Sequence, residues 1–391
     1  MLMLTNFSVQ RPQYELPQQR ALHWLSELHA TSEATLKGLS EQERAAFAVR
    51  FGKLLERCAC GPDKIGKRGH VTADLGAAAD LGASERLELY DVRRFPRGQG
   101  SAARSQVFAA LVNGYFEREY AGEAQAPSEL IHVTCTGYVS PSGAQRLVAN
   151  KGWGALTHVT HAYHMGCYAA LPAILMAAGH LGVPAALRPA NSERRVDIVH
   201  TELCTLHLDP SDHSAEQCVV QSLFADGFVR YSLRDTRESV GEHGFEVLAV
   251  SEHLLPDSAQ CMAWAVGDFG MHMTLTRDVP ERIASALRPF VSELFAKAGV
   301  SVAEALRHAV IAVHPGGPKI IDRVQEVLEL DPAQVQASRD VLFEHGNMSS
   351  ATLPHVWQRV LLDDTVSAGT LVLSLAFGPG LTVCGGLFRK H

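Results

Sequence analysis

The chain of 391 residues is long enough for two to four domains or for one large duplicated unit, because domains typically hold about 100–200 residues. It is 46% hydrophobic and 20% charged, as globular proteins are, and its net charge of -7 argues against a general nucleic-acid-binding protein, whose surface would be basic. No apolar run reaches the ~20 residues of a membrane span, the start lacks a secretory signal, and the eight cysteines form no framework. We therefore expect a cytoplasmic protein with reduced thiols.

In the first part of the chain, helical and strand-like segments alternate. Apolar residues spaced by three and four positions predict two helices near the start, and a short polar and basic stretch at 63–70 predicts a loop. From residue 107 onward, strand-like apolar runs follow helical ones. The expected helices are 18–29, 41–58, 107–120 and 168–181, and the expected strands are 130–136, 156–161, 197–202 and 227–233.

A similar pattern recurs after the polar stretch 236–244, which is the best linker candidate. Strands are expected at 245–253, 309–313 and 370–377, and helices at 282–297 and 333–345. The alternation in both halves predicts a layered α/β fold. The halves are candidates for a duplication, although residue identity alone does not establish one.

The segment around Cys167 is the first candidate for chemistry. A strand meets an apolar helix there, and Gly166 allows the tight backbone that such a turn needs. A cysteine at a helix N-terminus lies at the positive end of the helix dipole, which favours the thiolate, so we expect a thiol with a low pKa. The alternative is a buried structural cysteine, since free cysteines are among the most buried residues.

Two further segments present polar side chains at the ends of regular elements. His314 ends an apolar strand and precedes a rigid turn rich in glycine and proline, which would hold an imidazole at a sheet edge. Asn347 lies between a helix and the run Met-Ser-Ser-Ala, and its amide could stabilise an oxyanion. Taken singly, an ordinary turn histidine and a helix-capping asparagine explain these residues better.

Together the three segments follow the order Cys, His, Asn at a spacing that resembles the type III polyketide synthases, the chalcone synthase-like branch of the thiolase superfamily. Five motifs carry the resemblance over about 15–388. G-C-Y-A-A at 166–170 is similar to the family's G-C-F-A-G, V-H-P-G-G-P-K-I at 313–320 to A-H-P-G-G-P-x-I, and H-G-N-M-S-S-A at 345–351 to Y-G-N-M-S-S-A. F-A-D-G at 224–227 resembles F-G-D-G, and A-F-G-P-G-L-T-V at 376–383 resembles G-F-G-P-G-L-T-V.

The resemblance implies a thiolase fold, a duplicated αβαβα layered architecture, with an N-terminal half at 1–236 and a C-terminal half at 237–391, and a homodimer. It also implies that Cys167 accepts an acyl chain, while His314 and Asn347 polarise the thioester carbonyl and stabilise the enolate of the extender. The chemistry agrees, because an imidazolium keeps a nearby thiol ionised and one donor aimed at developing charge is worth about 2.7–4 kcal/mol.

No metal and no cofactor are expected, since the substrates carry their own phosphopantetheine or coenzyme A arm. The pair His161-x-x-His164 is the nearest approach to a zinc motif. It lies on a strand-like segment without companion ligands, which argues against zinc.

The substrate pocket is expected to depart from the family pattern. The family's gatekeeping phenylalanine corresponds to Phe224, and the position of the second gatekeeper, counted back from D-V-P, falls near Met273. The threonine that narrows the chalcone-type cavity falls near His207. A flexible thioether in place of an aromatic ring suggests a roomier tunnel, although neutral drift would give the same pattern. Ser349 and Phe377, within the matched motifs, complete the predicted lining.

The expected entrance to the pocket is less basic than in plant members, which bind coenzyme A phosphates through a basic helix. Here an acid, a proline and two cysteines interrupt the corresponding stretch, 53–68. Lys319, directly after H-P-G-G-P, occupies a position that holds a small residue in the family. We expect Arg68 and Lys319 to contact the donor, and the thinner pattern favours an acyl carrier protein over coenzyme A. The cations that remain in the stretch are Lys53, Arg57, Lys64, Lys67 and Arg68.

The sequence therefore predicts a Cys-His-Asn ketosynthase that joins two carrier-bound β-ketoacyl chains into an α-pyrone, similar to the stand-alone ketosynthases of the myxopyronin and corallopyronin type. One alternative is a malonyl-CoA-extending synthase that makes alkylpyrones or resorcinols. A second alternative is a non-catalytic thiolase-fold protein that only binds acyl carriers. The expected partners are an acyl carrier protein and a second copy of the chain, with neither nucleic acid nor membrane.

Overall fold

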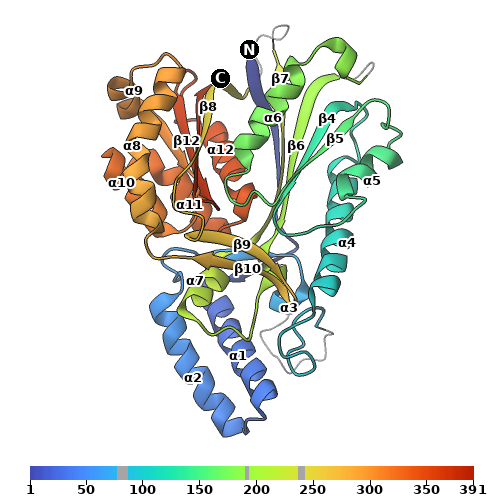
Figure 1. Ribbon diagram of the computed structural model, residues 1–391, viewed down its shortest axis with the longest axis vertical. Coiled ribbons are helices and arrows are strands. Elements are labelled where there is room, and N and C mark those ends of the chain that lie inside the picture. Colours follow the sequence, from blue (N-terminus) through green and yellow to red (C-terminus); the bar gives the residue numbers. More distant parts are fainter. Residues whose placement is uncertain (77–86, 190–192, 237–242) are drawn as a thin grey trace.

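A computed structural model describes residues 1–76, 87–189, 193–236 and 243–391 (Figure 1). The predicted linker at 236–244 falls largely on 237–242, which lie outside the described residues. Both termini lie at the same end of the molecule in Figure 1. None of the described helices is long and apolar enough to cross a membrane.

The centre of the fold is a mixed sheet of nine strands. Within its N-terminal part β4 runs parallel to both β5 and β6, whereas β7 and β1 follow in antiparallel fashion. In spatial order the strands are β5 (His158–Tyr163), β4 (Pro127–Thr134), β6 (Glu193–Leu203), β7 (Asp226–Asp235), β1 (Leu2–Gln10), β8 (Phe245–Leu254), β13 (Thr382–Lys390), β12 (Leu371–Gly378) and β11 (Val310–Val313).

The sheet contains the same arrangement twice. The strand series β4-β6-β7-β1 and β11-β12-β13-β8 each begin with a parallel pair and continue with two antiparallel pairs. The two series meet where Met3 and Leu4 of β1 pair with Glu246 and Phe245 of β8. This repeat confirms the predicted duplicated α/β architecture, while the boundary between 236 and 237 stays a prediction.

Helices fill the space between the two series, which are joined within the sheet through β1 and β8, and other helices cover their outer faces (Figure 1). The central layer is α6 (Ala170–Gly182) with α12 (Thr352–Leu362), and its apolar side chains pack against strands of both halves. On the outside, α4 (Ser101–Glu119) and α5 (Gly143–Asn150) cover the N-terminal half, and α8 (Val279–Lys297) and α10 (Pro318–Leu328) cover the C-terminal half.

Strands such as β4 and β11 are buried on both faces because they lie between two helical layers. In β4, Ile131 and Val133 face the central helices, whereas Leu130 faces the outer helices α4 and α5. In β11, Ala312 faces inward and Ile311 outward. Side chains alternate along a strand, so a continuous apolar run supplies both cores.

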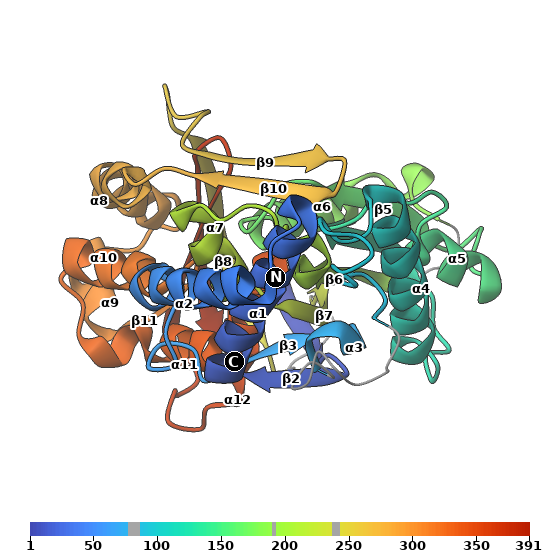
Figure 2. The same cartoon turned by 90° about the horizontal axis from the view of Figure 1, so that it is seen from below.

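The first two helices of the chain lie at the end of the molecule opposite the two termini (Figure 1). A hairpin of two long helices protrudes there, and a separate two-stranded hairpin, β9–β10, crosses one side beside α7 (Figure 2). The elements not yet given are α1 (Gln18–Lys37), α2 (Glu41–Cys58), α3 (Ala73–Gly76), α7 (Ala215–Leu223), α9 (Val302–His308), α11 (Gln336–His345), β2 (Tyr14–Pro17), β3 (Lys67–His70), β9 (Met262–Gly267) and β10 (Gly270–Leu275).

Several predicted boundaries agree closely with the structure. The helix predicted at 41–58 is α2, which begins after Ser40 with a reciprocal capping box to Glu43. The loop predicted at 63–70 was wrong in its second part, because β3 forms there by pairing with β2 from the chain start. The strand β1 and the hairpin β9–β10 were missed.

Candidate active site

The candidate site lies at the carboxyl ends of parallel strands, where open α/β sheets commonly bind ligands. Cys135 directly follows β4, Cys204 directly follows β6, and Cys167 comes four residues after β5. His314 directly follows β11 of the other half. The topology thus places three thiols beside the carboxyl ends of β4, β5 and β6 and the imidazole beside that of β11, and these ends meet where Gly166 approaches Pro379, which follows β12.

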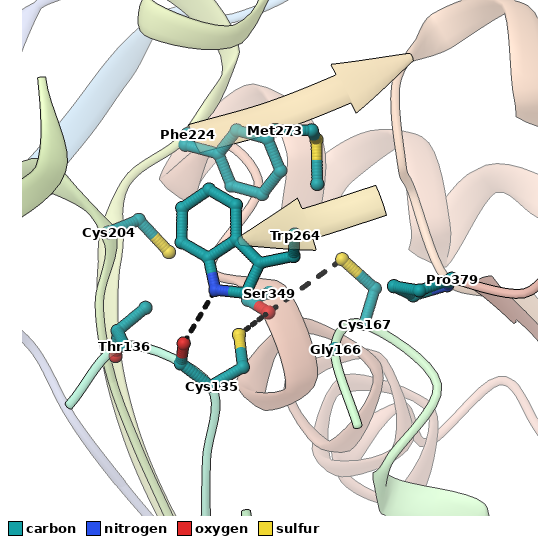
Figure 3. A pocket seen from close by; sticks show the side chains of 10 residues that line it. All are labelled: Cys135, Thr136, Gly166, Cys167, Cys204, Phe224, Trp264, Met273, Ser349 and Pro379. Carbon is teal, nitrogen blue, oxygen red and sulfur yellow. Dashed lines mark hydrogen bonds between the residues drawn. The ribbon is translucent and has the colours of Figure 1, made fainter. Parts of the chain in front are cut away.

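A pocket lies where these strand ends meet, and it holds about 320 Å³ of space, open solvent included (Figure 3). Its walls come from both halves of the fold and from the β9–β10 hairpin, and its side chains are mostly apolar or sulfur-bearing. The lining residues are Cys135, Thr136, Gly166, Cys167, Cys204, Phe224, Trp264, Met273, Ser349 and Pro379.

Cys167 lies in the turn that precedes α6, and its side chain is 6% exposed. Gly166 before it has a φ of +81°, and a Cβ there would lie 2.8 Å from the Cδ atom of Pro379. Only glycine fits both the left-handed backbone and this close approach. The turn is therefore built so that the sulfur points into the pocket.

Asn347 is held by a parallel bridge to Phe224. Its backbone carbonyl accepts a hydrogen bond from Ala225 N at 2.8 Å, and its side-chain Oδ1 accepts one from Ser349 N at 2.9 Å. With Oδ1 engaged, the amide N–H₂ remains for Cys167, to which the side chain is hydrogen-bonded. Through Oδ1, Asn347 also caps the 3₁₀ turn Ser349–Ala351 that leads into α12, so the capping role expected from the sequence is present as well.

Burial raises the pKa of Cys167 to about 12, although hydrogen bonds from Ser349 and Asn347 lower it. The low pKa expected from the sequence is therefore wrong for this structure. Two reasons are physical: α6 begins only at Ala170, so the sulfur lies outside its first turn, and a fully buried thiolate loses its hydration.

His314 is buried, and both ring nitrogens are without a hydrogen-bond partner in the described structure. Its backbone N–H donates to Leu375 O at 2.7 Å, which fixes its position beside β12. Burial lowers the pKa of the imidazole to about 3, so the ring is neutral at physiological pH. No hydrogen bond joins it to Cys167 among the residues described.

A second polar network, missed by the sequence analysis, lies beside Cys167. Cys135 Sγ is 3.1 Å from Ser349 Oγ and 3.5 Å from Glu202 Oε2. Glu202 also accepts hydrogen bonds from Thr136 Oγ1 at 2.9 Å and from the Ser350 hydroxyl, and burial raises its pKa. The available signal was the position of Cys135 at the end of a predicted buried strand.

Comparison with known proteins bears on the whole arrangement. Residues 246–390 match the family described as chalcone and stilbene synthases, C-terminal domain. A 1,3,6,8-tetrahydroxynaphthalene synthase of Streptomyces griseus is 28% identical over 323 residues, covering 80% of this chain and 83% of that protein. The probable polyketide synthase 1 of Dictyostelium discoideum is 29% identical over 276 residues, covering 70% of this chain and 8% of that much longer protein.

Among solved structures, the C-terminal type III polyketide synthase domain of Steely1 from Dictyostelium superimposes with a TM-score of 0.79 at 22% identity, covering 100% of this chain and 99% of that one. The C-terminal part of the chain thus resembles the chalcone and stilbene synthases, and the whole chain has the fold of the type III polyketide synthases. Its fold is accordingly the thiolase fold of these enzymes, as the sequence motifs predicted.

Three of the predicted substrate-binding residues line the pocket: Phe224, Met273 and Ser349. Their contact with a substrate stays a prediction. Met273 led us to expect a roomier tunnel, but that inference did not consider Trp264. The indole of Trp264 occupies the middle of the pocket in the view of Figure 3.

Two predicted pocket residues lie behind the lining. His207 is hydrogen-bonded through Nε2 to Thr136 O at 2.8 Å and packs edge-on against Trp264. Phe377 is buried in the cluster between the C-terminal half-sheet and its outer helices. Neither side chain is part of the pocket wall. His207 is held by Thr136 and Trp264, and Phe377 is covered by the apolar side chains of its cluster.

The predicted entrance residues are also corrected. Arg68 is 3% exposed, and its guanidinium donates to Gln18 Oε1 at 2.8 Å, Gln221 O at 2.9 Å and Phe224 O at 2.6 Å. It therefore holds internal segments together and is not a charge at the rim. Lys319 is exposed at the start of α10 and is not among the lining residues.

Over the ranges that the structure describes, no group of three or more His, Cys, Asp or Glu side chains is arranged to hold a metal ion. His161 Nε2 instead lies 2.8 Å from the hydroxyl of Ser142.

Proposed function

We propose that the protein is a ketosynthase that forms a carbon–carbon bond by Claisen condensation of acyl thioesters, with the acyl group held on Cys167. The observation that carries the proposal is the Cys167 sulfur, buried in a mostly apolar pocket beside the Asn347 amide. The pocket excludes water from a thioester, and the amide N–H lies near the atom where the carbonyl oxygen would gain charge.

In the first step the neutral imidazole of His314 takes the thiol proton, the sulfur attacks the acyl carbonyl, and the donor thiol leaves with that proton. A neutral ring suits this role, because burial favours its unprotonated form. Catalytic hydrogen bonds often tighten only when the substrate is bound, which fits a His314 without a partner in this structure.

In the second step the neutral imidazole of His314 takes an α-proton from a second β-ketoacyl thioester, and the resulting enolate carbon attacks the carbonyl on Cys167. The new carbon–carbon bond forms, the bond to sulfur breaks, and Cys167 regains a proton. Asn347 and His314 donate to the oxygen that carries the negative charge. An enol oxygen of the product then attacks the remaining thioester, expels its thiol and closes an α-pyrone.

We further propose that the chains arrive on an acyl carrier protein in the cytoplasm. Support comes from α2, where Arg50, Lys53 and Arg57 are exposed at i, i+3 and i+7 and so share one face. None of the three has an ion-pair partner in the described part of the chain. The end of α2 packs on α7, and the residue that caps α7, Phe224, lines the pocket.

A homodimer is part of the same proposal. The strand β5 is the last strand of the nine-stranded sheet, and one of its edges is unpaired in the described structure. An open edge strand of this kind can pair with another chain. Closed two-fold symmetry would let two β5 strands pair with each other.

The test is to incubate the wild-type protein with an acyl N-acetylcysteamine thioester and to measure its intact mass. An added acyl group that maps to Cys167, absent from Cys167→Ala, supports the proposal. Asn347→Ala should lower condensation by about 10²–10³-fold, as loss of one oxyanion donor does. A wild-type protein that stays unacylated would instead favour a non-catalytic carrier-binding protein.

A further inference from the structure

The β9–β10 hairpin lies outside the main sheet and contributes two side chains to the pocket. Trp264 of β9 and Met273 of β10 are directly opposite each other in the antiparallel register, so both side chains project from the same face. In the view of Figure 3 the indole lies between Cys204 on one side and Cys167 on the other. The hairpin thus forms the pocket wall that lies next to the Cys167 sulfur.

The indole is fixed by direct contacts. Its Nε1–H donates to Cys135 O at 2.6 Å, and its ring meets the His207 ring edge-on at 5.9 Å between centroids. Trp264 is partly buried, and its N–H would lose this hydrogen bond if the indole moved away from the carbonyl. The side chain is therefore held across the pocket.

The hairpin itself is also tied down. At its turn, Ser101 N donates to Asp268 O at 2.8 Å, and Gly270 N donates to Ser101 Oγ at 3.0 Å. Along β10, Gln217 Nε2 donates to Met273 O at 3.0 Å. These bonds come from α4 and α7, so the hairpin is anchored to elements of the rigid fold.

His207 joins the hairpin to the pocket wall. Met271 N donates to His207 Nδ1 at 3.2 Å, which leaves Nε2–H to donate to Thr136 O at 2.8 Å. This tautomer needs a neutral ring, and burial lowers the pKa of His207 to about 4. His207 is thus a positioning residue for the segment that carries Trp264.

We propose that Trp264 is a specificity-determining residue that limits the length of the acyl group accepted on Cys167. The inference rests on the proposed function, because it takes Cys167 as the acyl acceptor. A chain on this sulfur meets the indole before it can reach the space beside Cys204 and Thr136. The preferred donors are therefore short or compact acyl thioesters, and removal of the indole opens the remaining space.

The experiment compares acylation of Cys167 by straight-chain acyl N-acetylcysteamine thioesters, from acetyl to dodecanoyl, followed by intact mass. Wild type should show a steep loss of rate beyond a limiting length, since one misfitting methylene changes discrimination by about 10–200-fold. Trp264→Ala should raise the rate for the longest chains at least ~10-fold relative to acetyl, and Trp264→Phe should give an intermediate limit.

Val266→Ala is the matched control, because Val266 lies on the same strand, is 61% exposed and does not line the pocket. It should keep the wild-type length profile. Trp264→Phe keeps a ring in the hairpin and so remains informative if Trp264→Ala unfolds, which circular dichroism would reveal.

Profiles for Trp264→Phe and wild type that coincide over the whole series overturn the inference while leaving Cys167 as the acceptor. A failure of every thioester to acylate wild-type Cys167 overturns the proposed function and the inference with it. A limit that moves to longer chains in Trp264→Phe, and not in Val266→Ala, supports the inference.

Discussion

Cys135 and Cys167 follow different strands yet share one hydroxyl partner, the Ser349 side chain, at 3.1 Å and 3.7 Å from the two sulfurs. The two thiols differ in their other neighbours. Cys167 is hydrogen-bonded to the Asn347 amide, whereas Cys135 contacts the buried carboxyl of Glu202. A nearby carboxyl opposes the thiolate, so the environment favours Cys167 as the nucleophile.

Substitution of each cysteine should therefore have a different result. Cys167→Ala should reduce acyl uptake to background, because the Asn347 side chain acts on Cys167 and on neither of the remaining pocket thiols, Cys135 and Cys204. Cys135→Ala should retain acylation of Cys167 within about tenfold, which is about 1.4 kcal/mol in barrier. Intact mass with peptide mapping measures both. Acylation found on Cys135 in the Cys167→Ala protein would reverse the assignment.

The protonation state of Cys167 can be tested by alkylation. Burial raises its pKa to about 12, so the thiolate fraction should stay small at neutral pH and should rise only above the ~8.5 of a free thiol. Iodoacetamide labelling against pH, quantified on the Cys167 peptide, measures this, with half-buried Cys58 as an internal comparison. A labelling midpoint below ~8.5 would restore the thiolate expected from the sequence.

Folding stability should fall as the solution is acidified from pH 6.5 toward 4. Burial is the main cause that lowers the pKa of four histidines to about 4, so below pH 6.5 the unfolded chain binds more protons than the folded one. Asp226, whose pKa burial raises to about 7, acts in the opposite direction, as do Glu88, Glu202 and Glu252, whose pKa values burial also raises. The histidines outnumber them, because burial also lowers the pKa values of His132, His200 and His314 to about 3. The four histidines with a pKa of about 4 are His29, His70, His207 and His355.

Thermal unfolding followed by circular dichroism at several pH values measures this dependence. His29→Gln should weaken it, because His29 is fully buried against Gln221 at 2.8 Å and contributes one of the four shifts. A midpoint that is constant or rises between pH 6.5 and 4.5 would contradict the prediction.

Arg68 should matter for stability and not for donor binding. Arg68→Ala leaves the buried acceptors Gln18 Oε1, Gln221 O and Phe224 O without their donor, at about 1–3 kcal/mol for each unsatisfied group. Denaturant unfolding should therefore show a loss of at least ~2 kcal/mol. Lys319→Ala is the control, since this side chain is exposed and should leave stability unchanged. Equal stability of the two variants would show that the Arg68 network contributes little.

The contrast between Arg68 and Cys167 shows what the sequence could and could not predict. Periodicity located α2 to the residue, and short motifs located Cys167 and Asn347, because each signal is contained within a few neighbouring positions. Burial of Arg68 depends on partners 50 to 156 positions away. Trp264 meets Cys135 across 129 positions, so no local pattern marked Trp264 as a pocket residue.

The last prediction concerns the donor. Because Arg68 is buried, we assign carrier docking to the exposed basic face of α2 instead. If an acidic carrier protein docks there, removal of Lys53 and Arg57 should slow association, weaken its salt dependence and spare the chemical step. The double variant Lys53→Ala/Arg57→Ala should lower kcat/KM for a carrier-bound chain several-fold more than for the same chain on N-acetylcysteamine, which has neither phosphate nor protein. Glu56→Gln, an exposed neighbour on the same helix, is the matched control and should not lower it. Steady-state kinetics at two salt concentrations separate the effects. Unchanged relative efficiency would remove α2 from the docking surface, and a wild-type preference for coenzyme A thioesters over the same chain on a carrier would favour the malonyl-CoA-extending synthase, because the same cations could then pair with the phosphates of the nucleotide.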